Sequence, residues 1–207
     1  MKLVRFADWT NPVPPVRREV ISHQPAEAGD LPPVLFVAGR RHSAAAFAEH
    51  WLPHAAARGF AAHALTPRDR GDLRSHVHDV VQTAASLPRQ AVLIGHGTGA
   101  IVVAHALERY PARAAVLAAP ARSRWLPSRG ELPRPVGNPP VLVVGSPDDR
   151  VVPRKSLDGV AARFGGAPLL FPGMSHDLMR DVSWSEPIDA ILDWLTKESA
   201  TARHPLG

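Results

Sequence analysis

Five residues in the middle of the chain, Gly95-His96-Gly97-Thr98-Gly99, separate two apolar segments of different length. The segment before them, Ala91–Ile94, is a short continuous apolar run of the kind that forms a buried strand of a parallel sheet. The segment after them, residues 100–107, is long enough and apolar enough for a buried helix. Glycine permits turns that are too sharp for other residues. The pattern therefore predicts a strand, a tight turn and a helix.

The rest of the chain repeats this alternation of strand and helix. Strands are predicted for residues 16–23, 33–38, 60–65, 114–119, 141–144 and 168–171. Helices are predicted for residues 43–58 (with an irregularity at Pro53), 72–87 (with Asp72 as its cap), 98–109, 154–164 and 186–197. Alternating strands and helices form right-handed βαβ units. We therefore expect an α/β fold with a mostly parallel central sheet and helices on both faces.

Length and composition indicate a single domain. The chain has 207 residues, of which 45% are hydrophobic, so it can bury a proper core. We expect this core over residues 16–196, a short lid-like connection over 120–139 and a frayed C-terminal tail over 199–207. Because no apolar run has the length of a membrane span or a signal peptide, we expect a cytoplasmic protein that does not contact membranes. The absence of cysteine excludes disulfides and a thiol nucleophile.

The net charge of +5 comes from scattered arginines rather than from one basic face. Since no aromatic-rich basic face is visible, nucleic-acid binding is not expected. The local cluster Arg40-Arg41-His42 has two interpretations. It is either a solvated loop or a cationic rim that favours a carboxylate or another anionic small molecule. Nothing in the sequence indicates an oligomeric state, and no cofactor is expected.

Three polar motifs directly follow predicted strands. The first is the glycine-rich pentapeptide at 95–99, the second is Gly145–Pro153 with Asp148 and Asp149, and the third is Pro172–Met179 with His176. The carboxyl ends of parallel strands meet at one edge of a sheet, which is where α/β proteins bind ligands. These loops are therefore expected to lie together.

In this order along the chain, the three motifs resemble the nucleophile elbow, the acid and the histidine of the α/β-hydrolase superfamily. The likeness extends over residues 16–196. It implies an α/β-hydrolase fold with a minimal lid, in which Asp149 is the triad acid, with Asp148 as the alternative, and His176 is the triad histidine. Gly97 then stands where the family has its nucleophilic serine.

The resemblance also implies an oxyanion site made by the backbone N–H groups of Thr98 and Arg40. The family usually has His-Gly at the end of the preceding strand, whereas this chain has Ala38-Gly39. Gly39, His96 and Trp125 are expected on the rim of the pocket. Trp125 and Leu126 either form a small apolar flap over the site or pack onto the body of the domain.

Glycine at position 97 has no atom that can attack a carbonyl, so the resemblance does not extend to an ordinary serine-esterase mechanism. Three hydroxyls near the expected site, those of Thr98, Ser43 and Ser175, are candidate substitutes. We expect Thr98 to begin a helix and the two serines to serve as capping or surface residues.

Two histidine pairs lie on predicted helices. His50 and His54 are four residues apart and could share a face with a metal ion, but no third ligand is evident and Pro53 lies between them. A surface pair is the preferred interpretation. His76 and His78 diverge on a helix and are expected to be solvated. No motif has the spacing of a zinc site, so no metal is predicted.

Two functions remain open. The Asp149–His176 pair could act as a general base on water or on a proton of a small-molecule substrate, which would give hydrolysis or lyase-, isomerase- or cyclisation-type chemistry. Alternatively, the pair is a relic in a catalytically inactive protein that binds a ligand or serves as a scaffold. NDRG-like members of the superfamily are similar in having glycine at the elbow. A serine-to-glycine substitution made by design to trap a substrate is a third possibility.

Overall fold

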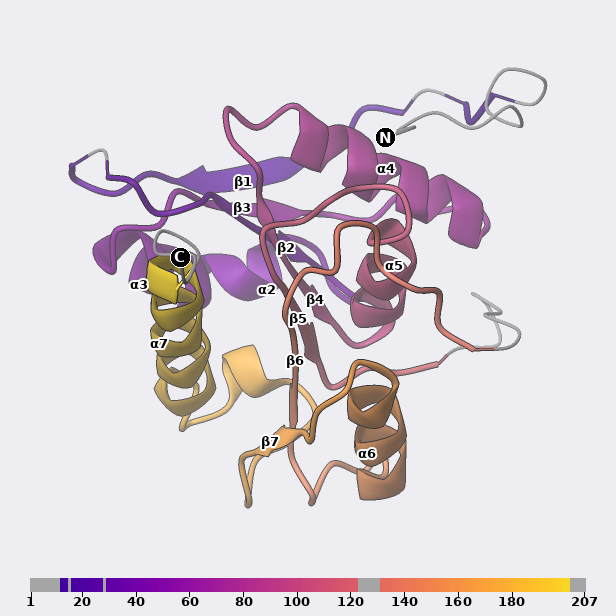
Figure 1. Cartoon of the computed structure of the whole chain (residues 1–207), viewed down its shortest axis with the longest axis vertical. Helices are drawn as coiled ribbons and strands as arrows, with labels where there is room; N and C mark the ends of the chain where they lie inside the picture. Colours follow the sequence, from indigo (N-terminus) through magenta and orange to yellow (C-terminus); the bar gives the residue numbers. More distant parts are fainter. Residues whose placement is uncertain (1–11, 15, 28, 123–130, 202–207) are drawn as a thin grey trace.

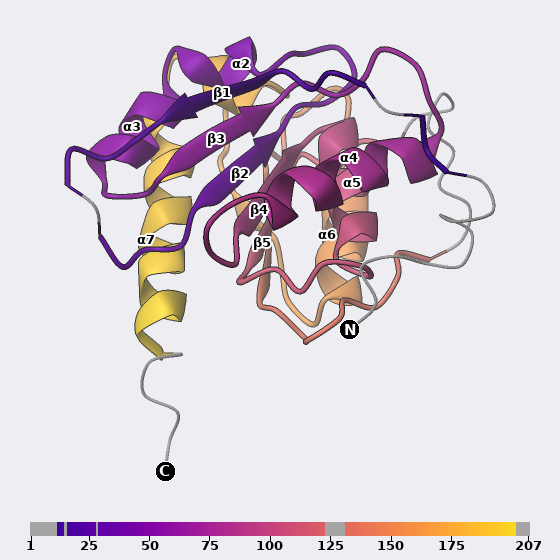
Figure 2. The ribbon, with the colours of Figure 1, turned by 90° about the horizontal axis from the view of Figure 1, so that it is seen from above.

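The computed structural model of the protein describes residues 12–14, 16–27, 29–122 and 131–201. Its centre is a sheet with the strand order β1-β3-β2-β4-β5-β6-β7 (Figures 1 and 2). The strands are β1 (Val20–His23), β2 (Val34–Val37), β3 (Ala62–Leu65), β4 (Val92–His96), β5 (Ala115–Ala118), β6 (Val141–Gly145) and β7 (Leu169–Leu170). Neighbouring strands run parallel except β1, which is antiparallel to β3. The predicted mostly parallel sheet is confirmed.

Helices cover both faces of this sheet, as the alternating pattern predicts. They are α2 (Ala45–Ala48), α3 (Trp51–Ala57), α4 (Leu73–Ala85), α5 (Thr98–Ala106), α6 (Arg154–Arg163) and α7 (Ser185–Thr201), with the short 3-10 helix η1 (Leu178–Arg180). Helices α2, α3 and α7 lie on one face, and α4, α5 and α6 lie on the other (Figure 1).

Strand β2 shows how the sheet forms two cores. All four of its residues are buried, and successive side chains point to opposite faces. Val34 and Phe36 belong to the core under α2, α3 and α7, where Phe36 packs against Trp51. Leu35 and Val37 belong to the core under α4, α5 and α6. A strand buried on both faces must be apolar throughout, which explains its continuous run.

Two of the elements predicted in the N-terminal half of the chain differ from those in the structure. The first strand was expected over 16–23, but only Val20–His23 pairs with β3, because β3 itself has four residues. The helix expected over 43–58 is divided into α2 and α3 at Glu49–His50. Pro53 lies in the first turn of α3, where its missing N–H removes no hydrogen bond. The helix therefore restarts before the proline.

The C-terminal end also differs from expectation. Of the tail predicted as frayed over 199–207, residues 199–201 belong to the last turn of α7, which ends at Thr201, while 202–207 lie outside the described residues. Of the expected lid-like connection over 120–139, the described parts contain no helix or strand, and Leu132 is buried in the core. Among the described residues, no helix has the length and apolarity required to cross a membrane.

Helix α4 carries an unexpectedly polar buried side. Asp72 caps it by accepting a hydrogen bond from the Ser75 N–H, as predicted. Further along, Asp79 is only 3% exposed and receives two hydrogen bonds from Arg68, at 2.6 and 2.7 Å. His76 was expected in solvent, but it is 5% exposed, so that prediction is wrong. It lies four residues from Val80 and shares the buried face of the helix.

The Arg68–Asp79 pair gives a first prediction. Arg68→Met would leave a buried carboxylate with Arg18 alone, at 3.4 Å. We expect a loss of about 3 kcal/mol in the free energy of unfolding, the lower end of the range for a broken buried pair. Urea unfolding measures it, with Arg70→Met on the exposed neighbouring loop as the matched control. A loss no larger than that of the control would contradict the prediction.

Burial of His76 gives a second prediction, on pH. Desolvation lowers the pKa of His76 below the ordinary 6.5, and this outweighs the attraction of Asp79 and Asp72, while Arg68 and Arg40 add to the lowering. The unfolded chain therefore binds the proton more readily. Stability that is present above pH 6.5 is lost as the pH falls below it, by at most about 1.4 kcal/mol per pH unit.

Replacement of the His76 side chain should reduce the pH dependence of stability. The stability difference between pH 7 and pH 5 is expected to be smaller in His76→Leu than in the parent protein, as measured by urea unfolding at both values. An NMR titration of the His76 ring in the parent provides the direct check. A midpoint at or above 6.5 would contradict the prediction.

Candidate active site

The turn between β4 and α5 has Gly97 at its apex. Its φ of 58° lies in the region that favours glycine, and its ψ is −123°. The turn is fixed by backbone hydrogen bonds on both sides. The Gly97 N–H donates to the Ala118 carbonyl at 2.9 Å, and the Gly97 carbonyl accepts from the N–H of Ala121 at 3.0 Å. Strand β5 and the segment after it therefore hold the apex in place.

Helix α5 begins directly beside the sheet. A Cβ placed on Gly99 would lie 2.3 Å from the carbonyl oxygen of Val37, a distance that real side chains do not reach. Only glycine allows the two backbones to approach so closely. The N-terminus of α5 is thereby set at the carboxyl end of β2, with the amide of Thr98 as the first helical N–H. Such N–H groups have no acceptor within the helix.

Asp149 and His176 meet across the loops that follow β6 and β7. The Nδ1 atom of His176 lies 2.7 Å from Oδ2 of Asp149. The other carboxylate oxygen accepts hydrogen bonds from the N–H groups of Val151 and Val152, at 2.6 and 3.1 Å. The Asp149 side chain is 1% exposed and that of His176 is 19% exposed. The acid is thus fixed by its own loop and orients an imidazole that reaches the surface.

The second nitrogen of His176 faces the glycine turn. A Cβ placed on Gly97 would lie 3.4 Å from Nε2 of His176. The structure therefore brings together Gly97, Asp149 and His176. It places Asp148 elsewhere, because the Oδ2 atom of that residue accepts a hydrogen bond from the N–H of Gly173 at 2.7 Å. Asp148 thus holds in place the loop that carries His176.

The loop after β2 contacts the same turn from the other side. The Arg40 N–H donates to Oγ1 of Thr98 at 2.8 Å, so one of the two amides expected in an oxyanion site has an internal acceptor. Gly39 packs closely as well, since a Cβ on it would lie 3.0 Å from the His96 carbonyl oxygen. The side chains of Arg40 and Arg41 are exposed.

The hydroxyls considered as substitute nucleophiles have contacts of other kinds. Oγ1 of Thr98 lies against the Arg40 amide. The Ser43 Oγ accepts a hydrogen bond from the Ala45 N–H at 3.3 Å, at the start of α2. Ser175 is exposed, and its N–H donates to Asp181. These positions agree with helix-terminal and surface roles.

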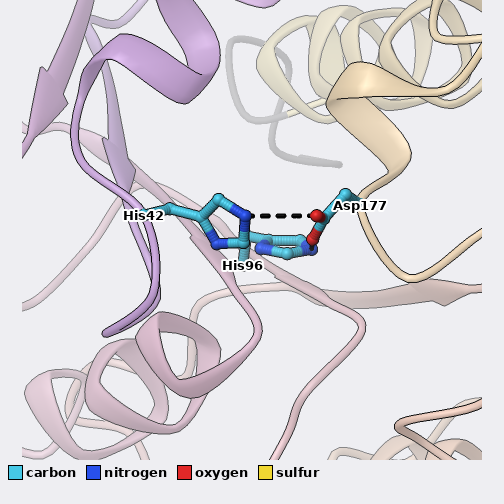
Figure 3. Close-up of side chains that lie close together, drawn as sticks. All are labelled: His42, His96 and Asp177. Carbon is cyan, nitrogen blue, oxygen red and sulfur yellow. Dashed lines mark hydrogen bonds and ion pairs between the residues drawn. The ribbon is translucent and has the colours of Figure 1, made fainter.

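His96, expected on the rim, is instead completely buried beneath the site. Its Nε2 donates to the His176 carbonyl at 2.9 Å, and the two rings lie 4.9 Å apart. Burial lowers the pKa of His96 to about 4, so its imidazole is neutral. Beside it, Nε2 of His42 lies 3.1 Å from Oδ2 of Asp177 (Figure 3). Sequence reasoning missed this second acid–imidazole pair.

Two cavities border the site within the described part of the chain. One of about 20 Å³ lies between Arg40, Thr98 and His76, and it has room for no more than a water molecule. A cavity of about 550 Å³ lies beyond β5 and β6, with Ala121 and Val152 in its wall. The volume is in the range of small-molecule sites. Trp125, expected as a flap, lies outside the described residues.

Solved structures of esterases and lipases have a similar fold. The monoacylglycerol lipase of Paleococcus ferrophilus is 15% identical with a TM-score of 0.68, and the match covers 88% of this chain and 100% of that one. Esterase 2 of Thermogutta terrifontis is 20% identical with a TM-score of 0.68, covering 88% and 89%. Est1E of Butyrivibrio proteoclasticus is 16% identical with a TM-score of 0.68, covering 88% and 96%. The fold is thus that of the α/β-hydrolases.

Sequence comparison gives the family. No curated protein sequence matches the chain. The serine hydrolase family, however, matches it over residues 34–185, which is more than half of its length. This stretch contains the glycine turn and both residues of the Asp149–His176 pair. The chain therefore belongs to the serine hydrolase family.

Proposed function

We propose that this protein is a small-molecule hydrolase that works without a serine nucleophile. In this proposal the Asp149–His176 pair acts as a general base on a water molecule above Gly97. The observation that carries it is the direction of His176, whose Nε2 lies 3.4 Å from the place of a Cβ on Gly97. Glycine leaves that space to a water or to a substrate oxygen. A base in reach of the proton that it must remove is the first requirement of such catalysis.

The proposed reaction needs no atom from residue 97. Nε2 of His176 takes a proton from water while the water oxygen attacks the carbonyl carbon of an ester or lactone. The bond to the alkoxide then breaks, and the imidazolium returns the proton to that oxygen. Asp149 keeps the imidazole in the required tautomer and stabilises its charged form. The same base could remove a proton from a substrate in lyase- or isomerase-type chemistry.

The proposed substrate is a small ester or lactone, and an anionic group would suit it. The exposed Arg40 and Arg41 follow the strand end that borders the site. The cavity of about 550 Å³ has Ala121 in its wall, and the N–H of this residue is bonded to Gly97. This contact supports the cavity as the place of the substrate's remaining part.

One observation favours a second candidate, a catalytically inactive ligand-binding protein. The Arg40 amide, one of the two donors expected for an oxyanion, is bonded to Oγ1 of Thr98. A substrate oxygen would have to displace that hydroxyl. Loss of a single oxyanion donor lowers the rate of another serine hydrolase by about 10²–10³-fold. A protein that only binds its ligand does not need the Arg40 amide as an oxyanion donor.

The tautomer of His176 gives a third prediction. If Nδ1 donates its proton to Asp149, the neutral ring carries no proton on Nε2 and can act as a base. ¹⁵N NMR of the neutral ring should report the Nδ1–H form. Asp149→Asn should populate the other tautomer. A parent protein with its proton on Nε2 would contradict the proposed base.

Activity assays give a fourth prediction. On a panel of short activated esters and lactones, the parent should turn over a substrate, and His176→Ala should reduce the rate by about 10²–10⁴-fold, the usual contribution of a general base. The matched control is His54→Ala, because His54 also pairs with a carboxylate, that of Asp189 at 2.7 Å, but lies between α3 and α7. Turnover that does not depend on His176 would rule out the base.

Substitution of Gly97 separates the two candidates. Gly97→Ser supplies an attacking hydroxyl, whereas Gly97→Ala adds the same Cβ and the same backbone strain at φ 58° without it. An inert parent together with an active Gly97→Ser would identify a disabled esterase and support the binder. The strain is expected to cost about 1–3 kcal/mol in both variants. Thermal unfolding of the pair therefore controls for misfolding.

A further inference from the structure

Three side chains converge beside the candidate active site. His42 comes from the loop between β2 and α2, His96 is the last residue of β4, and Asp177 directly precedes η1. One donor atom from each lies within 4.8 Å of the other two. Figure 3 shows His42 and Asp177 facing each other over the ring of His96. The chain thus gathers two imidazoles and one carboxylate from segments that are far apart in sequence.

The hydrogen bonds among these three residues leave one carboxylate oxygen of Asp177 unpaired. The His42 ring occupies Oδ2 of Asp177 at 3.1 Å, but Oδ1 of Asp177 is buried without a hydrogen-bond partner among the described residues. This oxygen is 3.9 Å from Nε2 of His96, which is too long for a hydrogen bond. A buried polar atom that stays unpaired destabilises the fold. The carboxylate therefore has an acceptor that a cation could use.

His96 has a ring lone pair that no hydrogen bond uses. Its Nε2 donates to the His176 carbonyl, so the proton is on that nitrogen and the lone pair is on Nδ1. Nδ1 is buried and has no hydrogen-bond partner among the described residues. A backbone carbonyl that holds the other ring nitrogen is the usual outer partner of a metal-binding histidine.

We propose that His42, His96 and Asp177 form a binding site for one divalent transition-metal cation, with Zn²⁺ as the best fit. Two imidazole nitrogens and one carboxylate oxygen are ligands that zinc accepts, and three protein ligands leave the fourth position to water. The harder cations Mg²⁺ and Ca²⁺ prefer oxygen ligands and are not expected to bind tightly.

The rings of His42, His96 and His176 lie close together. The ring centroids of His42 and His96 are 5.6 Å apart, and those of His96 and His176 are 4.9 Å apart. Asp177 provides one negative charge for this group, while Asp149 is already paired with His176. A single cation held by the imidazoles of His42 and His96 would use that charge. This proposal does not depend on whether His176 acts as a base.

Metal binding by the whole protein tests this as a fifth prediction. After treatment with a chelator and its removal, the protein is titrated with Zn²⁺ in a calorimeter and with Co²⁺ in a visible spectrophotometer. We expect one cation per chain and the intense visible bands of a four-coordinate cobalt site. His42→Ala and Asp177→Asn should each weaken binding by at least about 100-fold, more than the loss of an outer partner causes.

Matched controls are needed because the chain has 11 histidines, some of which bind metal weakly on any surface. His54→Ala and Asp189→Asn remove another histidine–carboxylate pair, with its atoms 2.7 Å apart, and should leave the affinity unchanged. Both ligands chosen for substitution are partly exposed, so their variants should fold, and circular dichroism checks this. The thermal midpoint should rise with Zn²⁺ in the parent and in the controls but not in Asp177→Asn.

Two results would overturn the proposal. The first is binding of Zn²⁺ by the parent that is no tighter than by His42→Ala. The second is an octahedral cobalt spectrum, with weak bands, in a folded parent protein that shows no thermal shift. Either result would mean that the three side chains form only a hydrogen-bonded cluster, and neither depends on any activity measurement.

Discussion

The arrangement of the whole site depends on the direct contact of two backbones, where α5 meets the sheet. A Cβ on Gly99 would lie 2.3 Å from the Val37 carbonyl oxygen, and one on Gly95 would lie 2.5 Å from Cα of Ala100. With no side chains between them, helix and strands are held at a fixed spacing. This spacing sets Gly97 at the carboxyl edge of the sheet and brings Thr98 to the Arg40 amide. The contact of Arg40 with the turn follows from the same packing.

Around this turn, the Asp149–His176 pair is held by hydrogen bonds from the loops after β6 and β7. Val151 and Val152 fix Asp149, and Asp148 fixes the loop of His176 through Gly173. None of these hydrogen bonds involves a side chain at residue 97. His96 lies between the Asp149–His176 pair and the His42–Asp177 pair, in ring contact with both histidines.

Much of the fold could be predicted because its signals are local. Continuous apolar runs mark strands that are buried on both faces, and Asp72 marks the start of α4. The meeting of Asp149 and His176 followed from the order of loops at one edge of a parallel sheet. The break before α3 was misplaced to Pro53, because tolerance of proline depends on its position within the first turn.

The remaining features could not be predicted because they depend on distant packing. Burial of His76 depends on which side of α4 faces the sheet next to Asp79, and a histidine at helical spacing suits either side. Contact between His42 and Asp177 joins residues 135 positions apart. For the cluster of His42, His96 and Asp177, the sequence offered one local signal, namely adjacency to the expected site. His96 directly precedes Gly97, and Asp177 directly follows His176.

The backbone at residue 97 also has a consequence for how such a protein evolves. At φ 58° a glycine is relaxed, whereas any L-residue there is strained by about 1–3 kcal/mol. A change from serine to glycine at this apex would therefore remove the nucleophile and stabilise the fold in one step. A change from glycine to serine would be thermodynamically uphill, so a nucleophile at this apex can be kept only where its activity is selected. Stability and a side-chain nucleophile therefore make opposite demands on residue 97.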